Sequence, residues 1–261
     1  MLLKDKRIVV TGAASGIGAE SARFLKNQGA TVIGVDRNKP AESIDSYIKA
    51  DLSDPSSILA ATEEMPSGID ALCNIAGLPP TRDRVMVLKV NFMGLRLFTE
   101  SMINKLNDNA SIVNIASLAG LGWPEAGTQV KNLIALADFD GVEELCDQNN
   151  VTQDNGRSYF FSKEALIVWT MMNRWTWRDR GIRMNCISPG PVETPILPDF
   201  LETLGERAEE DMRVMDRPGK PEDIAPVVAF LCSDWSNWIR GANIPCDGGM
   251  YQHVLCNMNG F

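Results

Sequence analysis

The sequence predicts an α/β fold, a doubly wound parallel sheet of seven strands with helices on both faces and a small helical insertion. Short apolar runs of strand length alternate with amphipathic helical stretches along most of the chain. A glycine-rich turn follows the first of these runs, and the second run ends in an aspartate. With 261 residues the chain can bury a full core, and we expect residues 1–261 to form a single domain.

The composition is that of a globular protein, with 44% hydrophobic and 23% charged residues. A net charge of −9 argues against nucleic acid and anionic membrane surfaces as partners. The six cysteines form no Cys-x-x-Cys pair, and the single histidine, His253, argues against a multi-histidine site, so we expect no metal. The charged amino terminus has no apolar signal core, which favours a cytoplasmic location.

A glycine-rich turn at residues 11–18 joins the first strand, residues 8–10, to an amphipathic helix. Strand, glycine turn and helix in this order are typical of phosphate binding. Gly12 permits the tight turn, Gly16 lets the backbone approach a pyrophosphate, and Gly18 lets the helix pack closely on the strand. The helix amino terminus offers N–H donors to that anion. The turn therefore indicates a phosphate-binding site.

The second strand, residues 31–35, ends in Asp36. An acidic residue at this point accepts hydrogen bonds from the adenosine ribose of NAD and repels the extra phosphate of NADP. Arg37 would tolerate that phosphate in part, whereas the neutral Ser15 would not assist it. The pattern favours NAD over NADP. The alternative at this stage is an unrelated α/β protein with similar glycine turns.

The third and fourth strands are expected at residues 48–50 and 69–75, followed by Asp51 and by the small-residue loop Ala76-Gly77. The fourth strand leads into a long helix predicted at residues 84–106.

Asn91 lies inside this predicted helix, although asparagine is a poor helix former. A buried amide there needs a hydrogen-bonding partner, which makes Asn91 a candidate for a polar site. A surface asparagine is the alternative.

The fifth strand, residues 111–116, ends at Ser117. The carboxyl ends of parallel strands open on the ligand crevice of a doubly wound sheet, so Ser117 is placed to donate to a substrate oxygen. The alternation of strand and helix breaks at residues 121–157. Two short helices, at residues 130–137 and 141–146, are predicted to form an inserted subdomain over the mouth of the crevice.

A long helix is predicted from residue 157, after a turn at residues 155–156. Tyr159 and Lys163 are four positions apart, so their side chains share one face of this helix. An ammonium about 5 Å from a phenol favours the phenolate by about 3 kcal/mol, or about two pKa units. Such a tyrosine can exchange protons with an alcohol or carbonyl. The alternative is an ordinary helix start with an exposed lysine.

The sixth strand, residues 182–187, ends in a rigid loop that carries the hydroxyl of Thr194. The amphipathic stretch that follows, at about residues 194–216, is interpreted as a substrate lid, with a plain surface helix as the alternative. A helix from Pro221 and a last strand at residues 242–246 complete the sheet.

These motifs together resemble the short-chain dehydrogenase/reductase family. In family order, the matching residues are Thr11-Gly12-x-x-x-Gly16-x-Gly18, Asp36, Asp51, Asn74-x-Ala76-Gly77, Asn91, Ser117, Tyr159-x-x-x-Lys163, Pro189-Gly190 with Thr194, and Asp247-Gly248-Gly249. The resemblance covers nearly the whole chain and implies a Rossmann fold. It also implies NAD(P)-dependent hydride transfer at a carbon that bears oxygen.

The resemblance also implies residue roles. Tyr159 would be the acid/base, Lys163 would lower its pKa and hold the nicotinamide ribose, and Ser117 would hold the substrate oxygen. Asn91 would order a water that links Lys163 to solvent. The expected cofactor-binding residues are Gly12, Ser15, Gly16, Ile17, Gly18, Asp36, Arg37, Asp51, Leu52, Asn74, Ala76, Gly77, Tyr159, Lys163, Pro189, Gly190, Val192 and Thr194. The expected substrate walls are Leu118, Pro79, Trp123, Phe160, Leu197, Phe200 and Met250, each of which has a plain core residue as its alternative.

Two features depart from the family pattern. Ile75 stands where the family often has a second asparagine, and the gap of 42 positions from Ser117 to Tyr159 is unusually long. A similar insertion is found in the bacterial branch that contains coniferyl-alcohol dehydrogenases and 3α-hydroxysteroid dehydrogenase/carbonyl reductases. The stretches 32–38, 163–169 and 183–186 resemble the coniferyl-alcohol side of that branch.

The resulting prediction is an NAD-dependent enzyme that interconverts an apolar or aromatic alcohol and its carbonyl. A 3α-hydroxysteroid dehydrogenase/carbonyl reductase is one alternative. A non-catalytic NAD-binding regulator is an alternative of another class, because a fold does not fix a function. The presence of all four catalytic residues disfavours it. The insertion precedes the Tyr159 helix, a surface on which many family members pair, so a dimer is expected rather than a tetramer.

Overall fold

A single seven-stranded parallel sheet forms the centre of the molecule, with strand order β3-β2-β1-β4-β5-β6-β7. The computed structural model describes residues 1–152, 156–205 and 213–261. The strands are β1 (Arg7–Thr11), β2 (Thr31–Asp36), β3 (Ser46–Lys49), β4 (Ile69–Asn74), β5 (Leu106–Ile115), β6 (Arg183–Pro189) and β7 (Asn243–Cys246). The strand order reverses between β1 and β4, which opens a crevice at the carboxyl ends of these strands. The predicted doubly wound sheet is confirmed.

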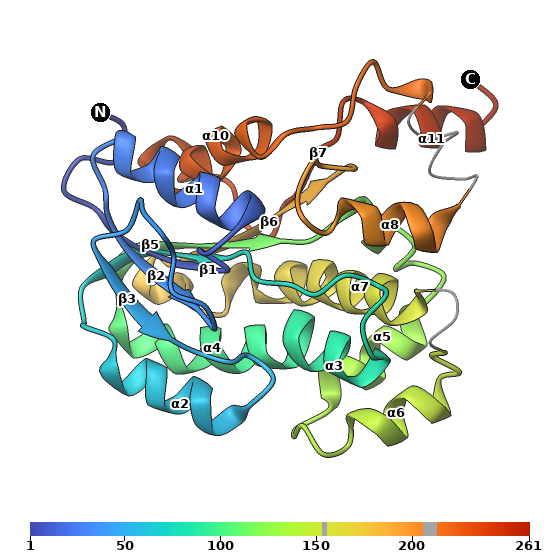
Figure 1. Ribbon diagram of the computed structural model, residues 1–261, viewed down its shortest axis with the longest axis horizontal. Coiled ribbons are helices and arrows are strands. Elements are labelled where there is room, and N and C mark those ends of the chain that lie inside the picture. Colours follow the sequence, from blue (N-terminus) through green and yellow to red (C-terminus); the bar gives the residue numbers. More distant parts are fainter. Residues whose placement is uncertain (153–155, 206–212) are drawn as a thin grey trace.

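Helices cover both faces of the sheet, with α1 and α10 on one face and α2, α3, α4 and α7 on the other (Figure 1). The helices are α1 (Gly16–Asn27), α2 (Pro55–Glu64), α3 (Arg84–Leu88), α4 (Leu95–Met102), α5 (Gly127–Ala135), α6 (Val142–Gln148), α7 (Arg157–Met172), α8 (Leu197–Leu204), α10 (Pro221–Cys232) and α11 (Met250–Met258). Side chains alternate between two cores, so Ile8 and Val10 pack toward α1 and α10, whereas Val9 packs toward α2 and α4.

The helix predicted at residues 84–106 is interrupted. Between α3 and α4 lies the π-helical segment η1 (Lys89–Gly94), which contains Asn91, and the 3₁₀ turn η2 (Ile103–Lys105) ends the helical run. Leu106, predicted as helical, is the first residue of β5 and pairs with Ile69 of β4. A register shift between Ile69 and Ala71 separates this pair from the regular pairing of β4 with residues 111–114. The apolar pattern of residues 111–116 therefore does not reveal that β5 begins at Leu106.

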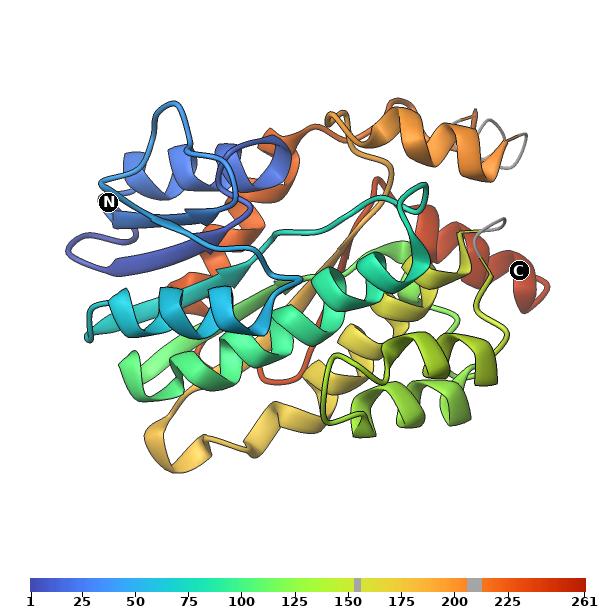
Figure 2. The ribbon, with the colours of Figure 1, turned by 60° about the horizontal axis from the view of Figure 1, so that its bottom comes forward.

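The two helices α5 and α6 lie within the predicted insertion at residues 121–157. Helix α5 packs on α7 and α6 packs on α3, which extends the helical layer (Figure 2). The Arg84 guanidinium binds the carboxylate of Asp147 at 2.6 Å and the carbonyl of Val151 at 2.8 Å. Neither helix lines the crevice, and among the described residues of this segment only 121–125 reach it. The expected position of the two helices over the crevice mouth is therefore wrong.

The expected lid at residues 194–216 contains α8, whereas residues 206–212 lie outside the described residues. Asn155, in the turn predicted before α7, lies outside them as well. Within the three described ranges, no helix combines the length and apolar character that a membrane crossing requires.

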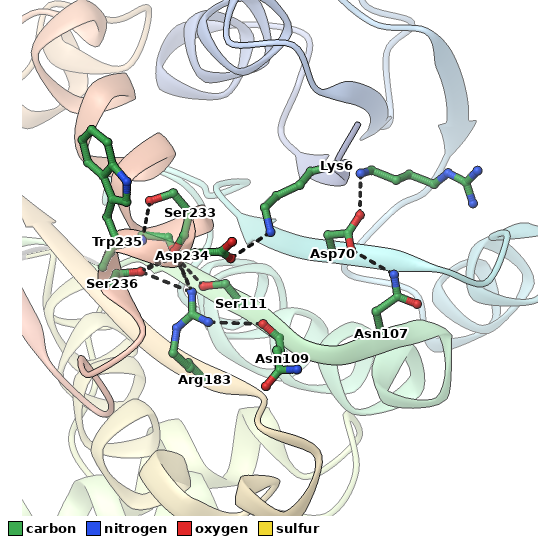
Figure 3. A network of polar contacts seen from close by, with 12 residues as sticks. Lys6, Asp70, Asn107, Asn109, Ser111, Arg183, Ser233, Asp234, Trp235 and Ser236 are labelled. Carbon is green, nitrogen blue, oxygen red and sulfur yellow. Dashed lines mark hydrogen bonds and ion pairs between the residues drawn. The ribbon is translucent and has the colours of Figure 1, made fainter. Parts of the chain in front are cut away.

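A buried arginine holds the opposite end of the sheet together. Arg183, the first residue of β6, is 2% exposed. Its guanidinium donates to the carbonyls of Asn109, Leu231 and Ser233 and to the hydroxyl of Ser236, at 3.0 to 3.3 Å (Figure 3). This network joins β5, β6 and the end of α10 at the amino ends of the strands.

Candidate active site

A cavity of about 910 Å³ lies at the carboxyl ends of the strands. It is lined by the turn after β1, by residues that follow β2 to β6, and by one side of α7. Of the predicted site residues, those that line it are Gly12, Ser15, Gly16, Ile17, Gly18, Asp36, Arg37, Asp51, Leu52, Ala76, Gly77, Ser117, Tyr159, Lys163, Pro189, Gly190, Val192 and Thr194. The cavity thus collects groups that are up to 246 positions apart in the sequence, from Gly12 to Met258.

The glycine turn is packed too tightly for other residues. Gly12 has a φ of +71°, and a Cβ there would lie 2.8 Å from the backbone of Ala76. A Cβ on Gly18 would lie 2.0 Å from the carbonyl oxygen of Gly12. Helix α1 begins at Gly16, and the side chain of Ser15 makes no capping hydrogen bond. The first N–H groups of α1 therefore face the cavity as a site that fits the pyrophosphate of a dinucleotide.

Asp36 is fixed at the edge of the cavity. Its carboxylate accepts hydrogen bonds from the backbone N–H groups of Ala14 at 3.1 Å and Asn38 at 2.9 Å. A carboxylate has about four acceptor positions, so Asp36 keeps capacity for a ribose diol. These residues fit a nicotinamide dinucleotide.

Asp51 is a second carboxylate at the cavity edge. Burial alone would raise its pKa, but hydrogen bonds from Ser53 outweigh burial and lower it. Asp51 therefore remains a charged acceptor.

Asn91 lies behind the cavity wall. Its side-chain oxygen accepts from the backbone N–H of Leu78 at 2.7 Å, and its amide donates to the carbonyl of Leu78 at 3.0 Å. A Cβ on Gly77 would lie 3.4 Å from the Asn91 oxygen and 3.9 Å from Lys163 Nζ, so these groups are neighbours. Asn91 fixes the loop after β4 and lies beside Lys163. It satisfies the expectation of a buried amide with a partner.

Asn74 does not reach the cavity, which contradicts its predicted contact with the cofactor. It is 1% exposed, and its amide donates to Thr99 and Asn114, each at 2.8 Å. The adjacent loop is instead held by Thr11, whose hydroxyl accepts from the N–H groups of Ile75 and Ala76. The position of Asn74 at the end of a buried strand turns its side chain into the core, where it joins β4 to β5.

Ser117, Tyr159 and Lys163 come together at the centre of the cavity. Lys163 Nζ donates to the carbonyl of Ile115 at 2.8 Å and lies 5.5 Å from the centroid of the Tyr159 ring. The Ser117 hydroxyl lies near the Tyr159 hydroxyl and acts to lower the pKa of the tyrosine. Phe200 of α8 packs its ring edge-to-face on Tyr159, with centroids 4.8 Å apart. The phenol, the hydroxyl and the amine thus form one polar cluster under an aromatic cover.

The direction of the Tyr159 pKa shift is opposite to the prediction. Burial raises the pKa of Tyr159 to about 12, and the nearby Ser117 hydroxyl opposes this only in part. Burial also lowers the pKa of Lys163 to about 8. Both shifts favour neutral forms, because removal from water penalises each charge more than the pair gains from attraction. The neighbouring amine alone therefore does not lower the pKa of the Tyr159 phenol.

The predicted substrate walls lie largely where expected. Leu118, Trp123, Phe160, Leu197, Phe200 and Met250 all line the cavity. Pro79 does not, because it is buried in the loop that Asn91 fixes. Four further lining residues, not anticipated from the sequence, are on α11: Tyr251, Val254, Leu255 and Met258. In the sequence these residues have helical spacing and follow the turn Asp247-Gly248-Gly249. That pattern could have indicated a helix with one side toward the cavity.

Comparison with known proteins decides the family. A model described as short chain dehydrogenase matches residues 6–128, and a model described as enoyl-(acyl carrier protein) reductase matches residues 145–251. A coniferyl-alcohol dehydrogenase from a Pseudomonas species is 46% identical over 252 residues, which cover 96% of this chain and 98% of that protein. The chain belongs to the short-chain dehydrogenase/reductase family. The resemblance recognised in the sequence is confirmed.

Two other relatives lie in the predicted branch of this family. A 3-alpha-hydroxysteroid dehydrogenase/carbonyl reductase from Comamonas testosteroni is 30% identical, over 93% of this chain and 95% of that one. A crystal structure of the 3-alpha-hydroxysteroid dehydrogenase from Pseudomonas sp. B-0831, complexed with NADH, superposes with a TM-score of 0.82 at 29% identity and covers 95% of this chain and 98% of that chain. This short-chain dehydrogenase is an oxidoreductase that acts on alcohol or carbonyl groups.

Proposed function

We propose that this enzyme oxidises an aromatic allylic alcohol of the coniferyl-alcohol type with NAD, or catalyses the reverse reaction. The observation that carries the proposal is the set of residues that line one cavity. The same cavity is lined by the glycine turn, by Ser117, Tyr159 and Lys163, and by an apolar end that includes Trp123 and Phe200. Such a cavity suits a dinucleotide and an aromatic alcohol bound side by side.

Tyr159 handles the proton in this mechanism. Its phenolate oxygen takes the hydroxyl proton of the alcohol, while the Ser117 hydroxyl holds the substrate oxygen and stabilises the phenolate. A bound oxidised nicotinamide would supply the hydride acceptor and a positive charge that would favour the phenolate. Lys163 holds the nicotinamide ribose, and Asn91 keeps the loop at Leu78 in place beside it. Asn91 further orders a water that carries protons between Lys163 and solvent.

Asp36 supports NAD as the cofactor. Its carboxylate lies at the cavity edge and would meet the extra phosphate of NADP as a like charge. Arg37 also lines the cavity and reduces this discrimination without removing it. The structural relative complexed with NADH agrees with this preference.

The relatives favour the aromatic allylic alcohol over a steroid, because the coniferyl-alcohol dehydrogenase shares 46% of its residues with this chain and the hydroxysteroid enzyme 30%. A hydroxysteroid is the second candidate, supported by the TM-score of 0.82 to a hydroxysteroid dehydrogenase.

The test is a panel of cinnamyl-type alcohols and hydroxysteroids, each with NAD and with NADP, followed by the absorbance of the reduced cofactor. The proposal predicts the highest kcat/KM for a cinnamyl-type alcohol with NAD. A hydroxysteroid that exceeds every cinnamyl-type alcohol would replace the proposed substrate. Binding of NAD without turnover of any alcohol would favour the non-catalytic regulator.

We propose a homodimer as the assembly. Helix α5 packs on α7 and occupies part of the surface on which many family members pair. Light scattering should give a mass of twice 28.7 kDa, and a tetramer would contradict a blocking insertion. A cytoplasmic location is also proposed, and cell fractionation tests it.

A further inference from the structure

One face of α11 forms a wall of the active-site cavity. The lining residues of this helix are Met250, Tyr251, Val254, Leu255 and Met258. Their spacing places them within about 140° of one another around the helix, and the residues that do not line the cavity occupy the opposite side. Helix α11 therefore has one side that faces the cavity and an opposite side that does not, along its whole length.

This wall is apolar and largely uncovered. Met250 at its base is 4% exposed, whereas Leu255 is 38%, Val254 41% and Met258 74% exposed. No other helix or strand of the described residues packs closely along α11. Apolar side chains that border a cavity and remain open to water gain free energy when an apolar ligand covers them.

The wall is continuous with the reactive centre, because one cavity contains both. Helix α8 lies at the same end of the molecule as α11 (Figure 1 and Figure 2). Two residues of the first turn of α8, Leu197 and Phe200, line the cavity, and Phe200 packs directly on Tyr159. A substrate whose reacting carbon lies at Tyr159 can therefore extend its other end between α8 and α11.

We propose that α11 is a specificity wall that binds the apolar part of the substrate remote from the reacting carbon. This inference rests on the proposed function and narrows it. The preferred substrates are alcohols with an extended, aryl-sized apolar group, and short alcohols bind weakly because they leave the wall uncovered. Each substrate methylene that the wall covers raises affinity about fourfold.

The wall acts on binding and not on the chemical step. Its contacts to the remote group are the same in the ground state and the transition state, so their loss raises KM and leaves kcat in place. Loss of a residue that merely supported the fold would lower the stability of the protein, and it would change kcat and KM to the same extent for every substrate.

The experiment compares Leu255→Ser and Met258→Ser with Cys256→Ser, a change on the outer side of the same helix. The substrates are cinnamyl alcohol and but-2-en-1-ol, which share the allylic carbinol and differ in the aromatic ring. For Leu255→Ser we expect a KM for cinnamyl alcohol about 10-fold higher, with kcat within about twofold of the wild type. The KM for but-2-en-1-ol should not change, and Cys256→Ser should match the wild type with both alcohols.

The possible outcomes separate the two proposals. If the wild type oxidises cinnamyl alcohol but the wall variants leave its KM unchanged, or change both alcohols equally, the specificity wall is wrong and the proposed function stands. If the wall variants instead change the mass in light scattering, the apolar stripe is a subunit contact, which also overturns the wall. A wild type inactive toward both alcohols with either cofactor would overturn both proposals.

Discussion

Two buried cations lie at opposite ends of the sheet, and they are bonded in different ways. Arg183, at the amino end of β6, donates to three backbone carbonyls and one hydroxyl (Figure 3). Lys163, on α7 beside the carboxyl end of β5, donates to the single carbonyl of Ile115 and borders the cavity. Burial lowers the pKa of both side chains. The guanidinium nevertheless stays charged, whereas the amine reaches a pKa of about 8.

This difference separates a structural cation from a chemical one. An ammonium group has three donors, and at Lys163 the donors not used by Ile115 are available to a ligand in the cavity. Arg183 uses the two terminal nitrogens of its guanidinium on the chain itself and joins three elements of the fold. The comparison predicts that loss of Lys163 mainly affects turnover and that loss of Arg183 mainly affects stability.

The largest expected effect is on turnover of Lys163→Met. Methionine preserves the apolar stem and removes the charge and the donors, so kcat should fall about 10³-fold. The urea midpoint of unfolding should not fall below that of the wild type, because a buried charge is removed with the side chain. Steady-state kinetics and urea unfolding on one preparation measure both. Retention of turnover would place Lys163 in the same structural class as Arg183.

Arg183→Met should show the reverse pattern. Its three carbonyl partners would each lose the guanidinium as a donor, although Leu231 and Ser233 keep hydrogen bonds from serine hydroxyls. The free energy of unfolding should fall by about 3 kcal/mol. Turnover per folded molecule should remain within about twofold, since Arg183 does not line the cavity. Arg183→Lys, which keeps the charge but loses the planar fork, is the matched control and should lie between the two. A stable Arg183→Met variant would contradict the structural role.

A smaller effect should appear in the pH dependence of stability. Between pH 8 and 10 the folded protein releases the proton of Lys163, whereas the unfolded chain retains it with a pKa of about 10.4. The unfolded state then binds more protons, so the unfolding free energy rises with pH across this window. Tyr159 opposes the rise only toward pH 10, where its usual pKa of about 10 lets it ionise in the unfolded chain, while a pKa of about 12 keeps it neutral when folded.

Urea unfolding of the wild type and Lys163→Met at pH 7.5 and 9.5 measures this effect. The wild type should gain up to about 2 kcal/mol relative to the variant, since the other titrating groups are common to both proteins. A difference between the two proteins that stays constant with pH would show that Lys163 keeps its ordinary pKa in the folded state.

Local patterns predicted much of the fold and of the cavity. The glycine turn, Asp36 and Ser117 follow strand ends, and the carboxyl ends of parallel strands meet at one edge whatever the details of packing. The position of α7 follows similarly from a single strong helical stretch. These features depend on neighbours in the sequence and on a known topology.

Other features depend on packing that the sequence does not display. Asn74 and Asn91 are both buried amides, but only the three-dimensional structure shows that Asn74 turns into the core and Asn91 toward the loop. The stripe on α11 has the pattern of an ordinary amphipathic helix, and its position at the cavity comes from the turn at Gly249. The Tyr159 pKa was misjudged because spacing gives the distance to Lys163 and not the burial of both groups.

The most direct test of the account is the turnover of Tyr159→Phe with cinnamyl alcohol and saturating NAD, with NADH binding measured on the same preparation. The account predicts a fall in kcat of at least about 10³-fold with NADH affinity within about threefold of the wild type. Tyr251→Phe, which removes the other phenol that lines the cavity, should reduce kcat far less. Near-normal turnover of Tyr159→Phe would contradict the central claim that this hydroxyl exchanges the substrate proton.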